Sequence, residues 1–221
     1  MSESPLDPIA TRLDHGLAEL GLTVDHRQRD RLVALVGLLH KWNRAYNLTA
    51  VRAPEAMVSR HLLDSASVLP YVKGSTLLDV GAGPGLPGLV LAILAPALRV
   101  SLLDSNGKKV RFQRQAVMEL ELDNVTPVQA RVEAFPGPQG GFDQVISRAF
   151  ASLGDFVSLT EALVAPGGQW LAMKGPAVAE ELVGLPEGIT PVERHHLAVP
   201  FEPGHRELVI LAHTGSTQGR S

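Results

Sequence analysis

A glycine-rich loop directly after a short apolar run is the segment of the chain best suited to hold a ligand. The run, residues 76–80, is typical of a buried strand, and Gly81, Gly83 and Gly85 follow Asp79 at every second position. Glycine lets a backbone lie against a bound molecule where any Cβ would clash. In open parallel sheets ligands bind beyond the carboxyl ends of the strands, so this loop is a candidate binding site.

Two cofactor classes fit the loop. From Gly83 to Gly88 it satisfies the G-x-G-x-x-G pattern of dinucleotide-binding proteins, but Pro84 and Pro87 remove amide donors that a pyrophosphate would use. With Asp79 counted in, the loop carries a carboxylate ahead of its glycines. That charge would repel a pyrophosphate, whereas it suits the cationic amino and sulfonium groups of S-adenosylmethionine. The loop therefore favours S-adenosylmethionine over NAD.

Other side chains lie at the predicted ends of the strands that follow. Asp104 closes the second strand and can accept hydrogen bonds from both hydroxyls of a ribose, each contributing roughly 1.5–3 kcal/mol. Val132 and Glu133 follow the third strand, where the cofactor's adenine would lie, although the start of a surface helix explains them equally well. Arg148 and Lys174 end the fourth and fifth strands, and we expect them to contact the cofactor or RNA phosphate.

The composition excludes several kinds of chemistry. The 221 residues include no cysteine, which excludes disulfides, thiolate metal sites and a cysteine nucleophile, and no set of residues indicates a metal site or covalent catalysis. Apolar residues make up 45% and charged residues 19%, as in a globular domain. No signal peptide and no apolar run of about twenty residues is present, so we expect a cytoplasmic protein without a membrane span.

The order of the predicted elements indicates an α/β fold. Strands that alternate with helices of ten to fifteen residues form a doubly wound, mostly parallel sheet. The last two strands are joined by a link too short for a crossover helix, so we expect them to pair antiparallel. The predicted strands are 76–80, 99–104, 125–130, 144–147, 169–173, 191–199 and 207–212, and the helices of this part are the one ending at Pro96, 107–120 and 153–163.

A helical extension precedes the sheet. We expect helices at 5–20, at a segment capped by Thr23 that continues through Tyr46, and from Pro54 through Leu63. Trp42 and Tyr46 lie on the apolar stripe of the second helix and are predicted to be core residues. The chain then divides into a helical extension (1–72), a domain built on the sheet with the glycine loop (73–213) and a disordered tail (214–221).

Charge is concentrated in the extension. The whole chain has a net charge of −3, whereas residues 27–60 hold seven cationic and two acidic residues, a balance of +5. Such a segment is commonly a solvated helix face, but beside a cofactor-binding sheet it fits a surface for RNA phosphates. Within the same region, His61 and Asp64 are three positions apart, and we expect a structural hydrogen bond between them. The cationic residues are Arg27, Arg29, Arg31, Lys41, Arg44, Arg52 and Arg60.

Several blocks of the sequence resemble one known family, the RsmG family, also called glucose-inhibited division protein B. The resemblance lies in Trp42–Thr49, His61–Ser65, Leu78–Gly88, Ser147–Phe150 and Met173–Gly175, which keep the family's order between about residues 27 and 212. The first and last blocks are far more specific than a glycine loop. One departure is Asn106, which stands where an apolar residue is expected.

The resemblance implies a class I methyltransferase that moves a methyl group from S-adenosylmethionine to N7 of one guanine in the 530 loop of 16S ribosomal RNA. It implies cofactor contacts at Gly81, Leu86, Val132, Glu133 and Arg148, to which the residues themselves add Gly83 and Asp104. It further implies that residues 73–213 are the methyltransferase domain and that the basic extension (1–72) faces RNA, and we expect RNA contacts at Arg44, Arg52 and Lys174. No catalytic base is expected, and Arg148 and Lys174 are the candidate contributors to catalysis.

Three alternatives stay open. The first is a class I methyltransferase that acts on another RNA, a protein or a small molecule, and the second is a nicotinamide-dependent oxidoreductase. The third is a non-catalytic RNA-binding or assembly factor. The RNA substrate itself could be naked 16S RNA, an assembly intermediate or the complete small ribosomal subunit.

Overall fold

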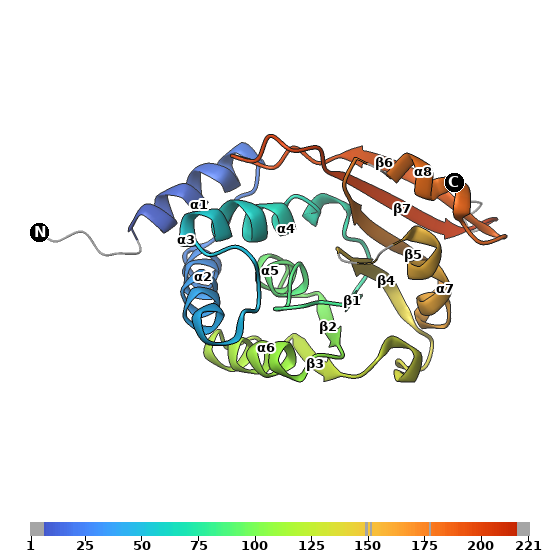
Figure 1. The fold of residues 1–221 in the computed structure, drawn as a ribbon, viewed down its shortest axis with the longest axis horizontal. Coiled ribbons are helices and arrows are strands. Elements are labelled where there is room, and N and C mark those ends of the chain that lie inside the picture. The colour runs from blue at the N-terminus through green and yellow to red at the C-terminus, as the bar shows by residue number, and fades with distance from the viewer. Residues whose placement is uncertain (1–6, 149, 151, 177, 216–221) are drawn as a thin grey trace, which may run out of the picture.

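The computed structural model describes residues 7–148, 150, 152–176 and 178–215 and has a seven-stranded sheet at its centre (Figure 1). The strand order is β3-β2-β1-β4-β5-β7-β6. Strands β1 to β5 run parallel, whereas β7 pairs antiparallel with both β5 and β6. The strands are β1 Thr76–Val80, β2 Arg99–Asp104, β3 Val125–Gln129, β4 Phe142–Ser147, β5 Val164–Lys174, β6 Ile189–His196 and β7 Glu207–His213.

The predicted fold class is confirmed. All seven expected strands are present and the last two pair antiparallel, although β5 begins five residues earlier than the pattern indicated. The sequence did not indicate that β7 would lie between β5 and β6. The helices are α1 Asp7–Glu19, α2 His26–Tyr46, α3 Pro54–Met57, α4 Asp64–Ala66, α5 Gly88–Leu94, α6 Gly107–Glu119, α7 Leu153–Thr160 and α8 Val178–Glu181, with a π-helical turn η1 at Val58–Leu63 and 3-10 turns at Leu69–Tyr71, Val132–Ala134, Glu161–Leu163 and Leu182–Gly184.

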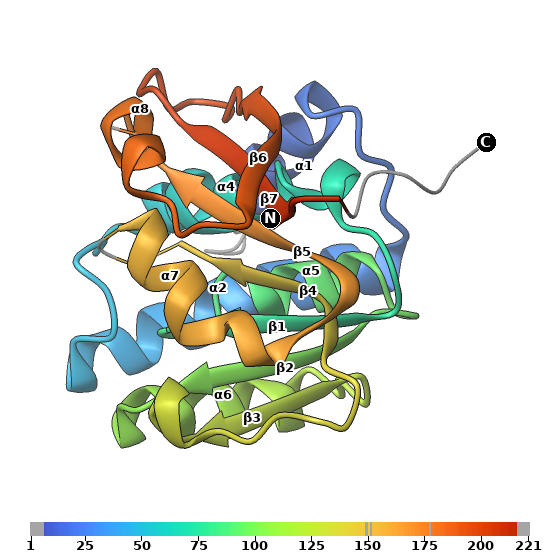
Figure 2. The same cartoon turned by 90° about the vertical axis from the view of Figure 1, so that its right-hand side faces the viewer.

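Helices cover both faces of the sheet, and the alternation of strand side chains decides which residues meet them. Leu77 joins the larger core with helices α1 to α6, whereas the next residue, Leu78, joins the smaller core under α7 and α8. Figure 2 shows α7 on one side of β4 and β5 and α5 on the other. The parallel strands β1, β2 and β4 are thus buried on both faces, as their largely apolar sequences require, whereas the edge strand β3 is partly exposed.

The N-terminal helices share the larger core. Trp42 of α2 packs edge-on against the fully buried Phe112 of α6, with ring centroids 5.7 Å apart. The prediction that Tyr46 is a core residue was wrong, because it lies at the last position of α2 and is 39% exposed. Helix α2 also begins later than predicted: Asp25, not Thr23, is its N-cap, in a capping box with Gln28.

The C-terminal segment that the structure describes contacts the residue just before β6. Within the described residues, no helix is long and apolar enough to cross a membrane. Thr214 donates its amide to Gly188 O at 2.7 Å, and residues 216–221 of the expected disordered tail lie outside the described residues. A domain boundary near residue 72 remains a proposal.

Because one core joins the N-terminal helices to the sheet, we expect the two parts to unfold together. The Trp170→Phe variant leaves Trp42 of α2 as the sole tryptophan. Its fluorescence and far-UV circular dichroism should give the same urea midpoint, and Phe112→Leu in that background should lower both midpoints equally. Two separate transitions, with Trp42 changing first, would contradict a shared core.

Candidate functional site

The loop after β1 is fixed by backbone contacts with β2. Gly81 and Ala82 both donate their amides to Leu103 O, at 2.9 and 3.1 Å. Gly81 has a φ of +68°, and a Cβ built on it would meet no atom within 4 Å. The residue therefore combines a backbone conformation that favours glycine with open space beside it. A ligand can lie directly against this backbone.

Asp79 stabilises the loop from beneath. Its side chain is fully buried, and Oδ2 accepts the amide of Gly88, the first residue of α5, at 2.8 Å. Oδ1 has no hydrogen-bond partner among the described residues, and burial raises the pKa of this carboxyl to about 7. Asp79 does not line the cavities described below, so its expected interaction with a cationic ligand is not a direct contact in this structure.

Asp104 holds the loop from the side. Oδ2 accepts the amide of Gly83 and Oδ1 accepts the amide of Asn106, both at 2.8 Å. Gln113 of α6 donates to Gly83 O, also at 2.8 Å. Each carboxylate oxygen of Asp104 can accept a further bond, so the side chain can hold the loop and still bind hydroxyl groups. The unexpected Asn106 is explained as the N-cap of α6.

A cavity of about 290 Å³ opens over the ends of β1, β2 and β3. Four of the predicted cofactor residues line it, namely Gly81, Asp104, Val132 and Glu133. Leu159 of α7, an exposed apolar residue, adds an apolar wall. The cavity therefore has carboxylates at its rim and an apolar side, a combination that suits a nucleoside.

The other three predicted cofactor residues line a second cavity of about 170 Å³ on the opposite side of the loop. These are Gly83, Leu86 and Arg148. Gly81 lines both cavities, so the two are adjacent. All seven predicted positions therefore lie around one loop, and a ligand extended along the loop can touch both groups.

One wall of the second cavity comes from the segment that follows α2, through Leu48 and Thr49. Asn43 is a buried residue of α2 that donates from Nδ2 to Val51 O and accepts the amide of Thr49 at Oδ1, both at 2.9 Å. One amide side chain thus fixes the segment that follows α2. Asn47 ends the helix with a φ of +51°. The side-chain contacts of Asn43 and the left-handed backbone of Asn47 give both asparagines of the block Trp42–Thr49 a structural role.

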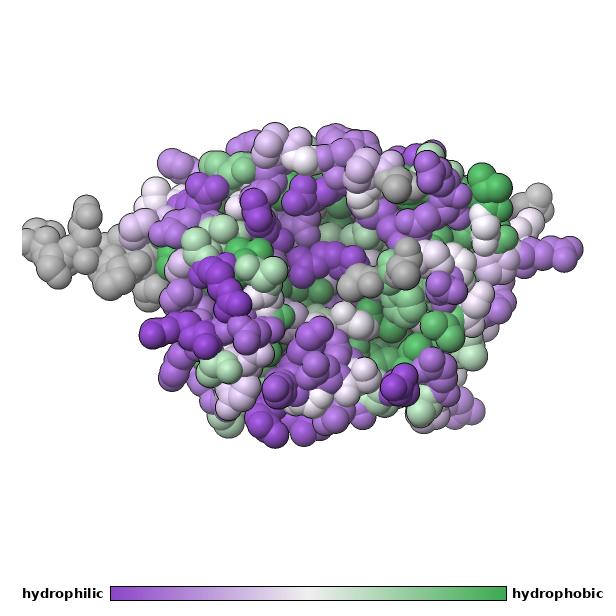
Figure 3. Space-filling model, in the orientation of Figure 1, coloured by the Kyte–Doolittle hydropathy of each residue, from purple (hydrophilic) through white to green (hydrophobic). Residues whose placement is uncertain are grey.

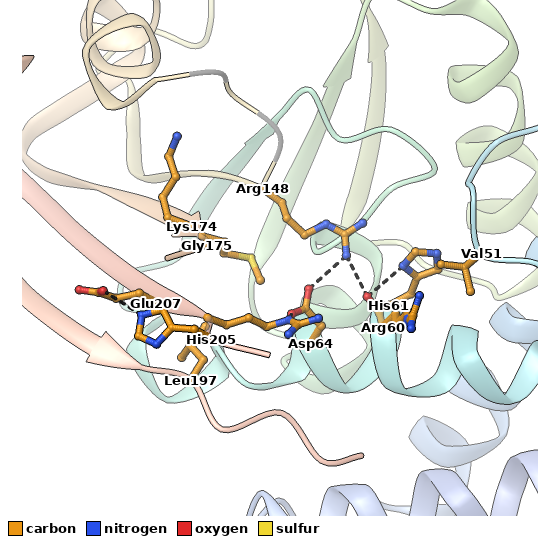
Figure 4. A pocket seen from close by; sticks show the side chains of 12 residues that line it. Val51, Arg60, His61, Asp64, Arg148, Lys174, Gly175, Leu197, His205 and Glu207 are labelled. Atoms are coloured by element: carbon orange, nitrogen blue, oxygen red, sulfur yellow. Dashed lines mark hydrogen bonds and ion pairs between the residues drawn. The ribbon is translucent and has the colours of Figure 1, made fainter. Parts of the chain in front are cut away.

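A third cavity, of about 450 Å³, adjoins the second at Arg148, which lines both. Figure 4 shows the Arg148 guanidinium directed at Asp64 and at the main chain of Arg60. Asp64 accepts Arg148 Nη1 at Oδ2 (3.2 Å) and Arg206 Nε at Oδ1 (2.8 Å). Its predicted hydrogen bond with His61 was wrong, because two guanidinium groups occupy its oxygens.

His61 makes other contacts that define its protonation state. Its Nδ1 lies 3.0 Å from Arg60 O and must carry the proton, so Nε2 accepts the Thr49 hydroxyl at 2.8 Å. Burial, followed by the positive charge of Arg148, lowers the pKa of His61 to about 4. His61 is therefore a neutral structural residue near pH 7. It joins η1 to the segment after α2 and supplies no base.

The predicted RNA-binding residues lie in different surroundings. Arg44 and Arg52 are both exposed, and Arg52 donates to Asn47 Oδ1 at 2.8 Å. Lys174, by contrast, is largely buried and contacts Glu181 at 2.7 Å and Phe150 O at 3.0 Å. In Figure 4 its side chain points away from the Asp64–Arg148 pair. An RNA contact at Lys174 stays a prediction that requires this ion pair to open.

Sequence reasoning missed Arg206 and the role of Asp64. Arg206 precedes the last strand, and its distance along the chain from Asp64 gave no signal of contact. Asp64 lies just after η1, and π-helical turns often mark functional sites, but the sequence pattern indicated only a helix there. Among the described residues, no group of three or more histidine, aspartate or glutamate side chains could hold a metal ion.

The sheet order, the glycine loop after β1 and the acidic residue ending β2 define a class I methyltransferase. Solved structures agree in fold. A SAM-dependent methyltransferase from Aquifex aeolicus aligns with a TM-score of 0.56 at 18% identity, over 71% of this chain and 92% of that chain. TrmN from Thermus thermophilus aligns at 0.55 and 17% identity, over 97% of this chain and 81% of that one.

Sequence comparison gives the family. Residues 28–209 match the GidB family, described as rRNA small subunit methyltransferase G, and the chain belongs to it. Ribosomal RNA small subunit methyltransferase G of Chromohalobacter salexigens is 66% identical over 200 residues, 90% of this chain and 95% of that protein. The protein of the same name from Pseudomonas aeruginosa strain LESB58 is 52% identical over 206 residues, 93% of this chain and 96% of that protein. The expected resemblance is confirmed.

The shifted pKa values of Asp79 and His61 predict opposite effects of pH on stability. Asp79 binds its proton more tightly in the folded protein, so its contribution is lost as the pH rises from about 4 towards 7. His61 resists protonation when folded, so its contribution is lost as the pH falls from 6.5 towards 4. Relative to wild type, Asp79→Asn should gain stability with rising pH and His61→Gln with falling pH, each on the order of 1 kcal/mol per pH unit.

Urea unfolding of the three proteins at several values between pH 4.5 and 6.5 measures these differences. Groups that titrate equally in all three proteins do not contribute to the difference in unfolding free energy between a variant and wild type. Parallel pH profiles for wild type and either variant would contradict the assigned protonation state of that residue.

Proposed function

We propose that this protein transfers the methyl group of S-adenosylmethionine to N7 of a guanine in the 530 loop of 16S ribosomal RNA. The observation that carries the proposal is the contiguous set of cavities. The two cavities around the glycine loop suit the cofactor, and the arginine-lined cavity joins them at Arg148. The family to which the chain belongs supports an rRNA substrate.

The residues of the loop fit S-adenosylmethionine. The open space above Gly81 accommodates a ligand where a side chain would intrude, and Asp104 keeps acceptor sites for ribose hydroxyls beside its two loop amides. The first of the two cavities beside the glycine loop, which Val132 and Glu133 line, suits the adenine. When bound, S-adenosylmethionine supplies an electrophilic methyl group. Gly83, Leu86 and Arg148 are the proposed contacts for the rest of the cofactor.

The absence of a catalytic base agrees with the chemistry of guanine N7. This nitrogen has an in-plane lone pair and no proton to lose, so the protein needs only to align it with the methyl group, at about 3–3.5 Å. His61 is neutral and fully engaged, and Asp79 is buried away from the cavities, so neither acts as a base in the proposal. Arg148 contributes by its position between the cofactor and substrate cavities.

The RNA-facing surface is smaller than the charge count of the sequence indicated. Arg29 pairs with Asp14 at 2.7 Å and Arg27 contacts Glu121 at 3.3 Å, so these charges are balanced within the protein. Arg44 and Arg52 remain exposed, and we assign phosphate contacts to them. Figure 3 shows that the surface over the end of α2 is largely hydrophilic. The substrate is 16S RNA, either free or within the small subunit or its assembly intermediate.

Methyl transfer from labelled S-adenosylmethionine to small ribosomal subunits that lack the modification tests the function. Nucleoside analysis should place the label in 7-methylguanosine, and sequencing of the modified RNA should place it in the 530 loop. Subunits that already carry the modification are the matched control and should take up no label. Label in another nucleoside or in protein, or none at all, would contradict the proposal.

The cofactor assignment predicts that Asp104→Asn weakens S-adenosylmethionine binding. Loss of charged hydrogen bonds of roughly 1.5–3 kcal/mol should raise the dissociation constant about ten- to a hundredfold, as measured by calorimetry. Asp123→Asn makes the same change of charge at an exposed residue before β3 and should bind normally. Equal affinities for both variants would remove Asp104 from the cofactor site.

A further inference from the structure

One carboxylate joins two arginines that are far apart in the sequence. Asp64 lies at the start of α4, Arg148 follows β4, and Arg206 precedes β7. Each oxygen of Asp64 accepts one guanidinium, at 3.2 Å for Arg148 and 2.8 Å for Arg206. The Asp64 side chain is only 7% exposed, whereas each arginine side chain is 26% exposed. The Asp64 carboxylate is therefore buried beneath the two arginines, whose side chains reach the cavity.

The contacts leave donors available. Arg148 uses Nη1 for both Asp64 and Arg60 O, so its Nε and Nη2 have no partner among the residues that the structure describes. Arg206 donates Nε to Asp64 and Nη1 to Gly204 O at 3.4 Å, and its Nη2 lies 3.8 Å from Glu202. Each of these two terminal nitrogens carries a second N–H that can bind a ligand. Both arginines line the 450 Å³ cavity. Two guanidinium groups fixed side by side with donors facing a cavity are suited to one tetrahedral anion, because arginine binds phosphate in a bidentate geometry.

We propose that Asp64 is a positioning residue that holds Arg148 and Arg206 together as a clamp for one phosphate of the RNA backbone. The clamped phosphate lies next to the base that is methylated, because Arg148 also lines the second cavity beside the glycine loop, where the cofactor is proposed to extend. This inference rests on the proposed function for its substrate. Without Asp64 the two guanidinium groups would repel each other and lose their shared orientation, although both would remain charged.

The inference differs from simple attraction between RNA and a basic surface. Asp64→Asn removes a negative charge from the cavity, so a surface acting by charge alone would bind RNA at least as tightly as wild type. A clamp that needs Asp64 would bind RNA more weakly in spite of the added positive charge. The difference is clearest at high salt, where long-range attraction is screened.

The experiment compares Asp64→Asn with Glu55→Gln, which removes one negative charge from an exposed residue of α3. We expect Asp64→Asn to lower both the affinity for small-subunit RNA at high salt and kcat/KM for methyl transfer about tenfold or more. Its affinity for S-adenosylmethionine should fall by a clearly smaller factor than its affinity for RNA, because Arg148 is the one member of the pair that is also a proposed cofactor contact. Glu55→Gln should match wild type in all three measurements, and Asp64→Glu should recover part of the loss.

A double-mutant cycle with Arg206→Gln then separates positioning from a general loss of structure. If Asp64 and Arg206 act in one clamp, the double variant should lose less RNA affinity than the sum of the two single losses. Additive losses, or RNA binding by Asp64→Asn equal to or tighter than wild type, would overturn the inference. A loss of S-adenosylmethionine affinity by Asp64→Asn as large as its loss of RNA affinity would also overturn it, since the defect would then not be specific to RNA.

The two proposals can fail separately. A wild-type protein that binds the RNA but forms no 7-methylguanosine would refute the proposed function, and the RNA-binding measurements would still decide the role of Asp64. A wild-type protein that forms 7-methylguanosine while Asp64→Asn matches it in both RNA affinity and kcat/KM would refute only the clamp.

Discussion

The shape of the loop after β1 depends on two carboxylates that accept its backbone amides. Asp79 holds the amide at the start of α5 and Asp104 holds the amide of Gly83, each at 2.8 Å. A glycine loop has little intrinsic preference for one conformation, so these bonds select it. The two acids differ in burial: Asp79 is sealed beneath the loop, whereas Asp104 reaches the cavity. Asp79 therefore only stabilises the loop, whereas Asp104 stabilises the loop and can also bind a ligand.

The N-terminal helices contribute one part of the site, and the ends of the strands contribute the other. Asn43 fixes the segment after α2, and η1 with α4 presents Arg60, His61 and Asp64 to the third cavity. Because these helices share the core that covers one sheet face, their position is set by apolar packing. The basic residues on them are divided accordingly. Some stabilise the protein through internal pairs, and those near the end of α2 remain available to a polyanion.

The sequence was sufficient to predict the elements and the position of the glycine loop, because strand and helix periodicities are local properties. The residues at strand ends were also predictable, since parallel strands bring their carboxyl ends to one edge. The interaction partners of the charged residues were not predictable from the sequence. Asp64 was expected to meet His61 three positions away, but tertiary structure brings two guanidinium groups to it, and charged donors bind a carboxylate more strongly than a neutral imidazole does. Lys174 and Arg29 show the same limit, since a count of charges does not reveal which ones are paired.

The placement of β7 has a consequence for synthesis of the protein. This strand is the last one described along the chain, yet it is hydrogen-bonded on both sides, between β5 and β6. While the chain leaves the ribosome, β6 emerges before the strand that joins it to the sheet, and Arg206 is added only just before β7. A nascent chain therefore lacks both a complete sheet and a complete arginine pair until residues 206–213 have been synthesised. A premature stop before residue 207 would remove an interior strand and leave β6 without its partner.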